Sequence, residues 1–140
     1  MNDSHFTVNF LNVTQIFPHE EIDEEHLVKL EEKMRNDGLW KKPIVVDRNT
    51  KVILDGHHRW HIAQKIGLKT IPVVEWDIFD ENIMVRPFRK DFPVYKELVL
   101  KRGKSGLLLP FKTTKHVWGK QEIPFIEILP QINILFSKLS

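Results

Sequence analysis

The sequence contains no cysteine in its 140 residues. Disulfides, thiolate zinc sites, iron–sulfur clusters and cysteine nucleophiles are therefore excluded. It also lacks a strong charge of one sign, because 21 Lys and Arg residues offset 19 Asp and Glu residues to leave a net charge of +2. This small net charge argues against general binding to polyanions, although local basic clusters remain possible.

No long hydrophobic run is present either. The longest stretch without Asp, Glu, Lys or Arg runs from Ser4 to His19 and contains several Ser, Thr, Asn and Gln residues. Such a stretch would not cross a bilayer cheaply. The N-terminus lacks the basic start and apolar run of a secretory signal. We therefore expect a cytoplasmic protein that does not contact membranes.

The composition is that of a folded domain. Hydrophobic residues make up 41% of the chain and charged residues 29%, which is typical of a soluble globular protein. A chain of this length has room for one modest core. We therefore expect one domain over residues 1–140.

Short strands and helices alternate along the chain. Asp23 is a good N-cap for a helix that Gly38 would end, and Gly67 would close another helix. The patterns predict strands over residues 6–13, 43–46, 52–54 and 70–76, further helices over 57–66 and 93–101, and a loop over 104–116. This order predicts a compact α/β (α+β) domain with a mixed sheet and short flanking helices.

The most distinctive motif is Asp55-Gly56-His57-His58-Arg59, placed where an apolar strand turns into a helix. Such a junction exposes backbone N–H groups and the positive end of the helix dipole, which favour anions. Gly56 allows a ligand to approach the backbone, Arg59 can grip phosphate oxygens, and the two histidines add donors. Asp55 could hold Mg²⁺ or orient a hydroxyl. The competing interpretation is a polar helix start that Asp55 caps.

Two further segments carry polar groups suited to phosphate chemistry. His19-Glu20-Glu21 follows the first strand, and a carboxylate there could act as a general base toward a hydroxyl. Residues 112–116, Lys-Thr-Thr-Lys-His, offer donors suited to phosphate. We expect this second segment to close over phosphates, with Gly103 and Gly106 giving it freedom to move. The competing interpretation of each segment is an ordinary solvated loop.

Other constellations are weaker. His57 and His61 share a helix face, but the metalloprotease pattern requires Glu directly after the first histidine, where His58 stands. The segment Lys101 to Gly106 does not follow the phosphate-binding loop pattern. The four tryptophans fit core positions or pocket walls better than platforms for stacked bases.

The stretch from Ile44 to Arg59 resembles the ParB/sulfiredoxin superfamily, whose members carry a short glycine-containing motif ending in Arg that binds nucleotide phosphates. Within this superfamily the chain is most similar to the free-serine kinases. These enzymes phosphorylate free L-serine to O-phospho-L-serine, with ADP or ATP as donor and Mg²⁺ as cofactor. Three separated motifs carry the resemblance: Pro18 to Ile22, Asp55 to Arg59, and Ser105-Gly106 leading into residues 112–116.

The resemblance implies a role for individual residues. Glu20 would activate the acceptor hydroxyl, Glu21 would lie at the substrate as the close alternative, and Asp55 would place substrate or metal. Two segments would hold the donor phosphates: Gly56, His57, His58 and Arg59, and Thr113, Thr114, Lys115 and His116. The implied partners are L-serine or a similar acceptor and a nucleotide, rather than nucleic acid.

Two alternatives belong to the same superfamily. One is a ParB-type nucleotide-dependent regulator that binds DNA, and the other is a ParB-like nuclease with metal-bound water. We expect no helix-turn-helix domain of the ParB kind within these 140 residues and no extended basic groove. Sulfiredoxin activity is excluded, because it needs a cysteine. The sequence therefore favours the kinase.

Overall fold

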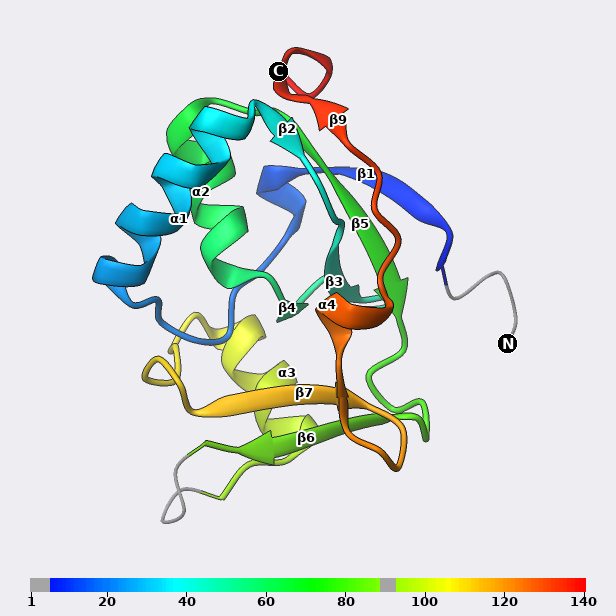
Figure 1. Cartoon of the computed structure of the whole chain (residues 1–140). Coiled ribbons are helices and arrows are strands. Elements are labelled where there is room, and N and C mark those ends of the chain that lie inside the picture. Colours follow the sequence, from blue (N-terminus) through cyan, green and yellow to red (C-terminus); the bar gives the residue numbers. More distant parts are fainter. Residues whose placement is uncertain (1–5, 89–92) are drawn as a thin grey trace.

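A computed structural model describes residues 6–88 and 93–140 (Figure 1). Its centre is a four-stranded sheet in the order β1-β5-β3-β4, formed by β1 (Val8–Asn12), β5 (Thr70–Trp76), β3 (Ile44–Asp47) and β4 (Ile53–Asp55). The inner strands β3 and β5 are parallel, and the two edge strands run antiparallel to their neighbours. The mixed sheet and the expected α/β class are therefore confirmed.

Two helices cover one face of this sheet (Figure 1). Helix α1 (Glu24–Asp37) begins at Asp23, whose side chain accepts from the Glu25 N–H, and ends at Gly38 with φ of 65°. Helix α2 (His57–Ile66) forms the crossover from β4 to β5, which lets β5 lie parallel to β3. The core on this face joins both helices to the sheet and includes Leu27, Met34, Ile44, Val46, Ile53, Ile62, Ala63, Ile71 and Val73.

The opposite face is covered by the second half of the chain. This half contains a three-stranded sheet of β6 (Ile83–Pro87), β7 (Thr114–Trp118) and β8 (Ile123–Pro124), together with α3 (Lys96–Ser105) and α4 (Phe125–Ile128). Its core includes Val45, Val74, Trp76, Val99, Trp118 and Phe125. Strand β3 is thus buried on both faces, as a continuous apolar run favours.

Short elements complete the described structure. They are two 3₁₀ turns, η2 (Val13–Gln15) and η3 (Phe136–Lys138), and a strand pair of β2 (Leu39–Trp40) with β9 (Ile134–Leu135). Three of the four tryptophans, Trp40, Trp76 and Trp118, are buried as expected. The longest described helix, α1, has 14 residues, and none of the described helices has the length and apolarity that a membrane crossing requires.

Two expectations about the second half were wrong. Helix α3 begins at Lys96 rather than at Pro93, runs through Gly103, and ends before Gly106. The helix was expected to stop at Gly103, but Gly103 is buried inside it and packs so closely on Val52 that a Cβ there would overlap the Val52 side chain. Residues 114–116 are not a loop, because β6 pairs with them along β7. The expected loop with freedom to close over phosphates is therefore not present. Gly103 lies in helix α3, and residues 114–116 lie in the paired strand β7.

The fold predicts a strict requirement for glycine at residue 56. Gly56 has φ of 114°, and a Cβ there would also overlap the Ile44 side chain. We expect Gly56→Ala to lower the free energy of unfolding by about 2–4 kcal/mol, from overpacking and backbone strain together. Gly67→Ala is the matched control, because Gly67 has φ of 90° and open space around its Cβ position. Urea unfolding of both variants checks this, and equal losses would contradict the packing role.

Candidate active site

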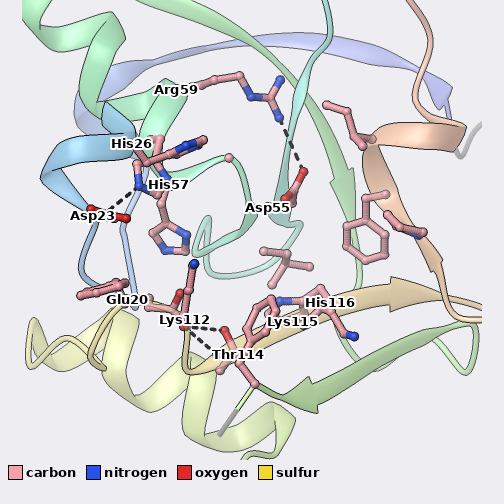
Figure 2. A pocket seen from close by; sticks show the side chains of 18 of the residues that line it. Glu20, Asp23, His26, Asp55, His57, Arg59, Lys112, Thr114, Lys115 and His116 are labelled. Atoms are coloured by element: carbon pink, nitrogen blue, oxygen red, sulfur yellow. Dashed lines mark hydrogen bonds and ion pairs between the residues drawn. The ribbon is translucent and has the colours of Figure 1, made fainter. Parts of the chain in front are cut away.

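A cavity of about 830 Å³ lies where three segments meet (Figure 2). They are residues 16–23, which connect η2 to α1 and are called the first loop below, the start of α2, and strand β7. This volume is within the usual range of small-molecule sites. The cavity brings together all of the site residues expected from the sequence except Thr113: Glu20, Glu21, Asp55, Gly56, His57, His58, Arg59, Thr114, Lys115 and His116. Segments separated by almost one hundred residues therefore form one site.

The first loop is fixed to the rest of the fold by backbone hydrogen bonds. The Glu21 N–H donates to the Leu109 carbonyl at 2.7 Å, and the Leu109 N–H donates to the His19 carbonyl at 2.9 Å. A further bridge joins Phe17 to Val52 beside β4. Backbone pairing of this kind leaves the intervening side chains little freedom, so Glu20 is held at a defined place in the cavity wall.

Glu20 is half-buried and its Oε1 atom faces the start of β7. The backbone N–H groups of Thr113 and Thr114 donate to this oxygen at 3.2 and 2.8 Å, and the Thr114 hydroxyl lies 2.9 Å from it. Burial raises the pKa of the Glu20 carboxyl, and the hydrogen bonds from Thr114 and Thr113 offset part of that rise. A carboxylate with a raised pKa is better suited to accept a proton.

His19 lies fully buried beneath Glu20, and sequence reasoning gave it no role of its own. Its Nδ1 atom is 2.7 Å from the Ile53 carbonyl oxygen and its Nε2 atom is 3.0 Å from the Thr114 hydroxyl. Burial lowers the pKa of His19 to about 4, against a smaller opposing effect of the Ile53 carbonyl. The ring is therefore neutral at neutral pH.

His57 and His58 anchor the first loop to α2. The backbone N–H of His19 donates to His57 Nε2, and that of Asp23 donates to His58 Nε2, both at 3.1 Å. An accepting ring nitrogen carries no proton, so each neutral ring has its proton on Nδ1. Burial lowers the pKa of both rings, and that of His57 falls well below 6.5. At neutral pH each ring thus offers one N–H rather than a positive charge.

Asp55 and Arg59 face each other across the strand–helix junction. Arg59 Nη2 lies 3.5 Å from Asp55 Oδ2, and Arg59 Nη1 donates to the Lys42 and Pro43 carbonyl oxygens at 2.6 and 3.2 Å. Desolvation raises the pKa of the Asp55 carboxyl, and Arg59 opposes this. Since Nη1 is already occupied, Arg59 holds the junction together as well as supplying charge to the cavity.

Further positive charge in the cavity comes from two exposed lysines on the β7 side. Lys112, with φ of 54°, and Lys115 both line the cavity, and Lys115 Nζ lies 5.6 Å from the centre of the Phe88 ring. Phe88 and Phe111 are exposed aromatic groups at the same cavity. Sequence reasoning did not single out these aromatic residues or His26, whose ring lies 4.5 Å from that of His58. No local pattern marks them, because they meet only in the fold.

Thr113 and His116 differ from the expected free phosphate ligands. The Thr113 side chain is fully buried outside the cavity lining, and its hydroxyl donates to the Pro110 carbonyl. The buried His116 ring lines the cavity, and its Nε2 atom has no hydrogen-bond partner among the described residues. Burial lowers the pKa of His116 well below 6.5, so this ring is also neutral.

The residues of the cavity suit a metal ion that enters bound to a phosphate ligand, rather than one held by protein side chains alone. Among the described residues, no group of three or more His, Asp or Glu side chains converges to hold a metal. Mg²⁺ needs only one or two carboxylates when phosphates and water supply its other oxygens. Asp55, in the cavity wall, can supply such an oxygen. The donor set therefore fits phosphate-bound Mg²⁺ and does not fit a preformed zinc site at His57 and His61.

The sequence of this chain is similar to one protein family and to several individual proteins. Residues 3–88 match the family model of the ParB N-terminal domain. The ATP-dependent L-serine kinase of Staphylothermus marinus is 35% identical over 86 residues, which cover 59% of this chain and 34% of that protein. The ADP-dependent L-serine kinase SerK of Thermococcus kodakarensis is 30% identical over 106 residues, which cover 70% of this chain and 43% of that protein. The chain thus spans less than half the length of these curated relatives.

A solved structure extends the similarity over the whole fold. The free serine kinase in complex with AMP superposes with a TM-score of 0.80 and covers 97% of this chain and 95% of that chain. At 18% identity this likeness concerns the fold, and it includes α3, β7 and β8, which lie outside the family match.

The neutral histidines predict that acid destabilises the protein. As the pH falls from about 6.5 to about 4, His19 takes up a proton in the unfolded chain but not in the folded one. The unfolded state then binds more protons, so His19 alone should cost about 3 kcal/mol of stability. His57 and His116 act in the same direction, whereas the raised pKa values of Glu20 and Asp55 act against them.

Urea unfolding between pH 7 and pH 4 measures this dependence. His116→Phe should make the loss of stability on acidification shallower, because one of the three groups no longer titrates. An unchanged slope in this variant would show that His116 is not held neutral by the fold.

Proposed function

This chain belongs to the ParB N-terminal domain family, and we propose that it transfers the terminal phosphoryl group of ADP or ATP to the hydroxyl of free L-serine. The observation that carries the proposal is Glu20, a half-buried carboxylate with a raised pKa in the wall of a cavity whose α2 and β7 sides carry groups that suit an anion. The serine kinases to which the chain is similar support the choice of acceptor.

The donor phosphates would lie between α2 and β7. The first turn of α2 supplies free N–H groups and the positive end of its dipole. Lys112 and Lys115 face it from the opposite wall (Figure 2). His57 and His58 would add neutral N–H donors, and the exposed rings of Phe88 and Phe111 would border the nucleoside. Phosphoryl transfer depends mainly on such positioning and charge neutralisation.

Glu20 would take the proton as the acceptor oxygen attacks. The hydroxyl O–H bond breaks, and a new O–P bond forms to the terminal phosphorus. The bond from that phosphorus to the bridging oxygen breaks, so AMP leaves from ADP, or ADP leaves from ATP. A positioned base of this kind contributes about 10²–10⁴-fold in rate. Glu21 lies in the same cavity wall and would bind the acceptor.

Asp55 would hold the magnesium ion that accompanies the nucleotide. Mg²⁺ bound to the donor phosphates would neutralise the charge that develops on them. Arg59 would keep the Asp55 carboxylate in position through the 3.5 Å ion pair.

Glu20→Gln should abolish most phosphoserine formation and leave nucleotide affinity nearly unchanged. The glutamine oxygen can still accept from Thr113 and Thr114, so the geometry survives, but the side chain cannot take the proton. We expect kcat to fall by about 10²–10⁴-fold. Mass spectrometry of phosphoserine gives kcat, and calorimetry gives the nucleotide affinity. Glu21→Gln is the matched control; a larger loss of kcat there would reassign the base.

Lys115→Met should weaken nucleotide binding by roughly 10- to 150-fold, because a charge-assisted contact contributes about 1.5–3 kcal/mol. Lys101→Met is the control, since Lys101 is exposed on α3 and does not line the cavity. Calorimetric titration with ADP and with ATP measures both variants. Equal affinities would remove Lys115 from the phosphate site.

One observation favours a second candidate function. The family match ends at residue 88, so it contains the Asp55–Arg59 motif but none of β7. A nucleotide-dependent regulator that binds DNA, or a nuclease, would need only the matched part. Fluorescence anisotropy with labelled duplex DNA, with and without nucleotide, separates these cases. Nucleotide-dependent DNA binding without phosphoserine formation would support the regulator, and cleavage of the duplex would support the nuclease.

A further inference from the structure

Three close contacts connect Glu20 to the backbone of β4 through two buried side chains. Glu20 Oε1 lies 2.9 Å from Thr114 Oγ1, Thr114 Oγ1 lies 3.0 Å from His19 Nε2, and His19 Nδ1 lies 2.7 Å from the Ile53 carbonyl oxygen. All three distances are hydrogen-bond distances. His19 is 0% exposed and Thr114 is 7% exposed, so the polarity of each bond is set by the protein.

The protons in this chain of contacts are too few for all three bonds. The Ile53 carbonyl and an ionised Glu20 can only accept. A neutral His19 brings one N–H and Thr114 brings one O–H. Three contacts therefore share two protons, and one contact is not a hydrogen bond while Glu20 is ionised.

The Ile53 carbonyl decides the tautomer of His19. Because this oxygen accepts only, the shortest contact of the three requires the His19 proton on Nδ1. Nε2 is then a bare acceptor, and the Thr114 O–H has two acceptors within reach, His19 Nε2 at 3.0 Å and Glu20 Oε1 at 2.9 Å. Glu20 Oε1 already accepts from the Thr113 and Thr114 N–H groups, whereas Thr114 is the donor that faces His19 Nε2 among the described residues, so a hydroxyl proton directed to Nε2 satisfies both acceptors. The other titratable groups around His19 do not reverse this order: His57 and His116 contact its ring at 4.5 and 5.7 Å and are held neutral, and Lys96 acts on His116.

We propose that His19, fixed by the Ile53 carbonyl as the Nδ1–H tautomer, draws the Thr114 hydroxyl proton to itself and turns the Thr114 oxygen lone pair toward Glu20. The carboxylate then faces an acceptor instead of a donor, which makes Glu20 a stronger base. His19 and Thr114 are positioning residues for this base. The effect of these two residues on catalysis rests on the proposed function, whereas the directions of their hydrogen bonds do not depend on it.

Proton uptake by Glu20 removes the repulsion at the Thr114 contact. The O–H bond that breaks in the acceptor becomes an O–H bond on Glu20 Oε2, because Oε1 is engaged by Thr113 and Thr114. The neutral carboxyl no longer repels the Thr114 lone pair, and the Thr114 O–H stays directed to His19 Nε2.

The tautomer of His19 is measurable in the resting wild-type protein. Long-range ¹H–¹⁵N correlation spectra at pH 7 should show His19 neutral, with the proton on Nδ1 and an unprotonated Nε2. A proton on Nε2, or a doubly protonated ring, would overturn the proposal. This measurement needs no substrate and no variant, so it stands whether or not the chain phosphorylates serine.

The second test follows the Glu20 carboxyl by ¹³C titration in His19→Phe, which keeps a ring between His57 and His116 but removes both nitrogens. The Thr114 hydroxyl is then free to donate to Glu20, and the pKa of Glu20 should fall by about one unit. Thr114→Ser keeps the hydroxyl and should leave it nearly unchanged. An unchanged or raised Glu20 pKa in a folded His19→Phe protein would contradict the proposal. If that variant does not fold, Thr114→Val decides the question, because removing a lone pair that faces Glu20 lowers the pKa of Glu20, whereas removing a hydroxyl donor raises it.

The kinetic counterpart separates positioning from a purely structural role. In His19→Phe the acid limb of the kcat profile should move to lower pH by the same amount, with the KM for nucleotide unchanged. Loss of kcat at every pH without a shift of that limb would assign His19 a structural role only. Absence of phosphotransfer in the wild type, with the expected tautomer, would overturn the proposed function and leave the hydrogen-bond assignment intact.

Discussion

One carboxylate oxygen, Glu20 Oε1, holds the two halves of the cavity together. It accepts from the backbone N–H groups of Thr113 and Thr114, at the start of β7, while the loop that carries it is tied to α2 through His57 and His58. Because the partners are mostly backbone groups, the fold itself sets the position of the carboxylate. Displacing this oxygen would leave buried N–H groups unpaired, which costs about 1–3 kcal/mol for each.

The same network explains how charge is divided in the site. Burial lowers the pKa values of His57, His58 and His116, so these three rings are neutral hydrogen-bonding groups rather than positive charges. The positive charges of the cavity are those of Lys112, Lys115 and Arg59. Glu20 lies on the wall where backbone N–H groups donate to its carboxylate. A basic carboxylate and a cationic phosphate site can thus share one cavity without forming an ion pair that would quench the base. This separation is what a transfer from nucleotide to hydroxyl requires.

Local signals in the sequence were sufficient for much of the first half of the fold. Asp23 and Gly38 marked the ends of α1, and Gly67 marked the end of α2, because caps act within a few residues. The Asp55–Arg59 motif was found because a strand–helix junction is a local signal, whereas the roles of Glu20 and of residues 113–116 came from the resemblance to the free-serine kinases. Strand β7 was missed because its partner β6 lies about thirty residues earlier. The role of His19 was missed for the same reason: its contacts to Ile53 and Thr114 exist only after folding.

The central claim is that one cavity moves a phosphoryl group from nucleotide to a hydroxyl with Glu20 as base. The most direct test is ³¹P NMR of the protein with L-serine, Mg²⁺ and either ADP or ATP. The account predicts a phosphomonoester signal from O-phosphoserine that grows in step with loss of the terminal phosphate of one of the nucleotides. Nucleotide that stays intact, or that yields inorganic phosphate at a rate independent of serine, would contradict it.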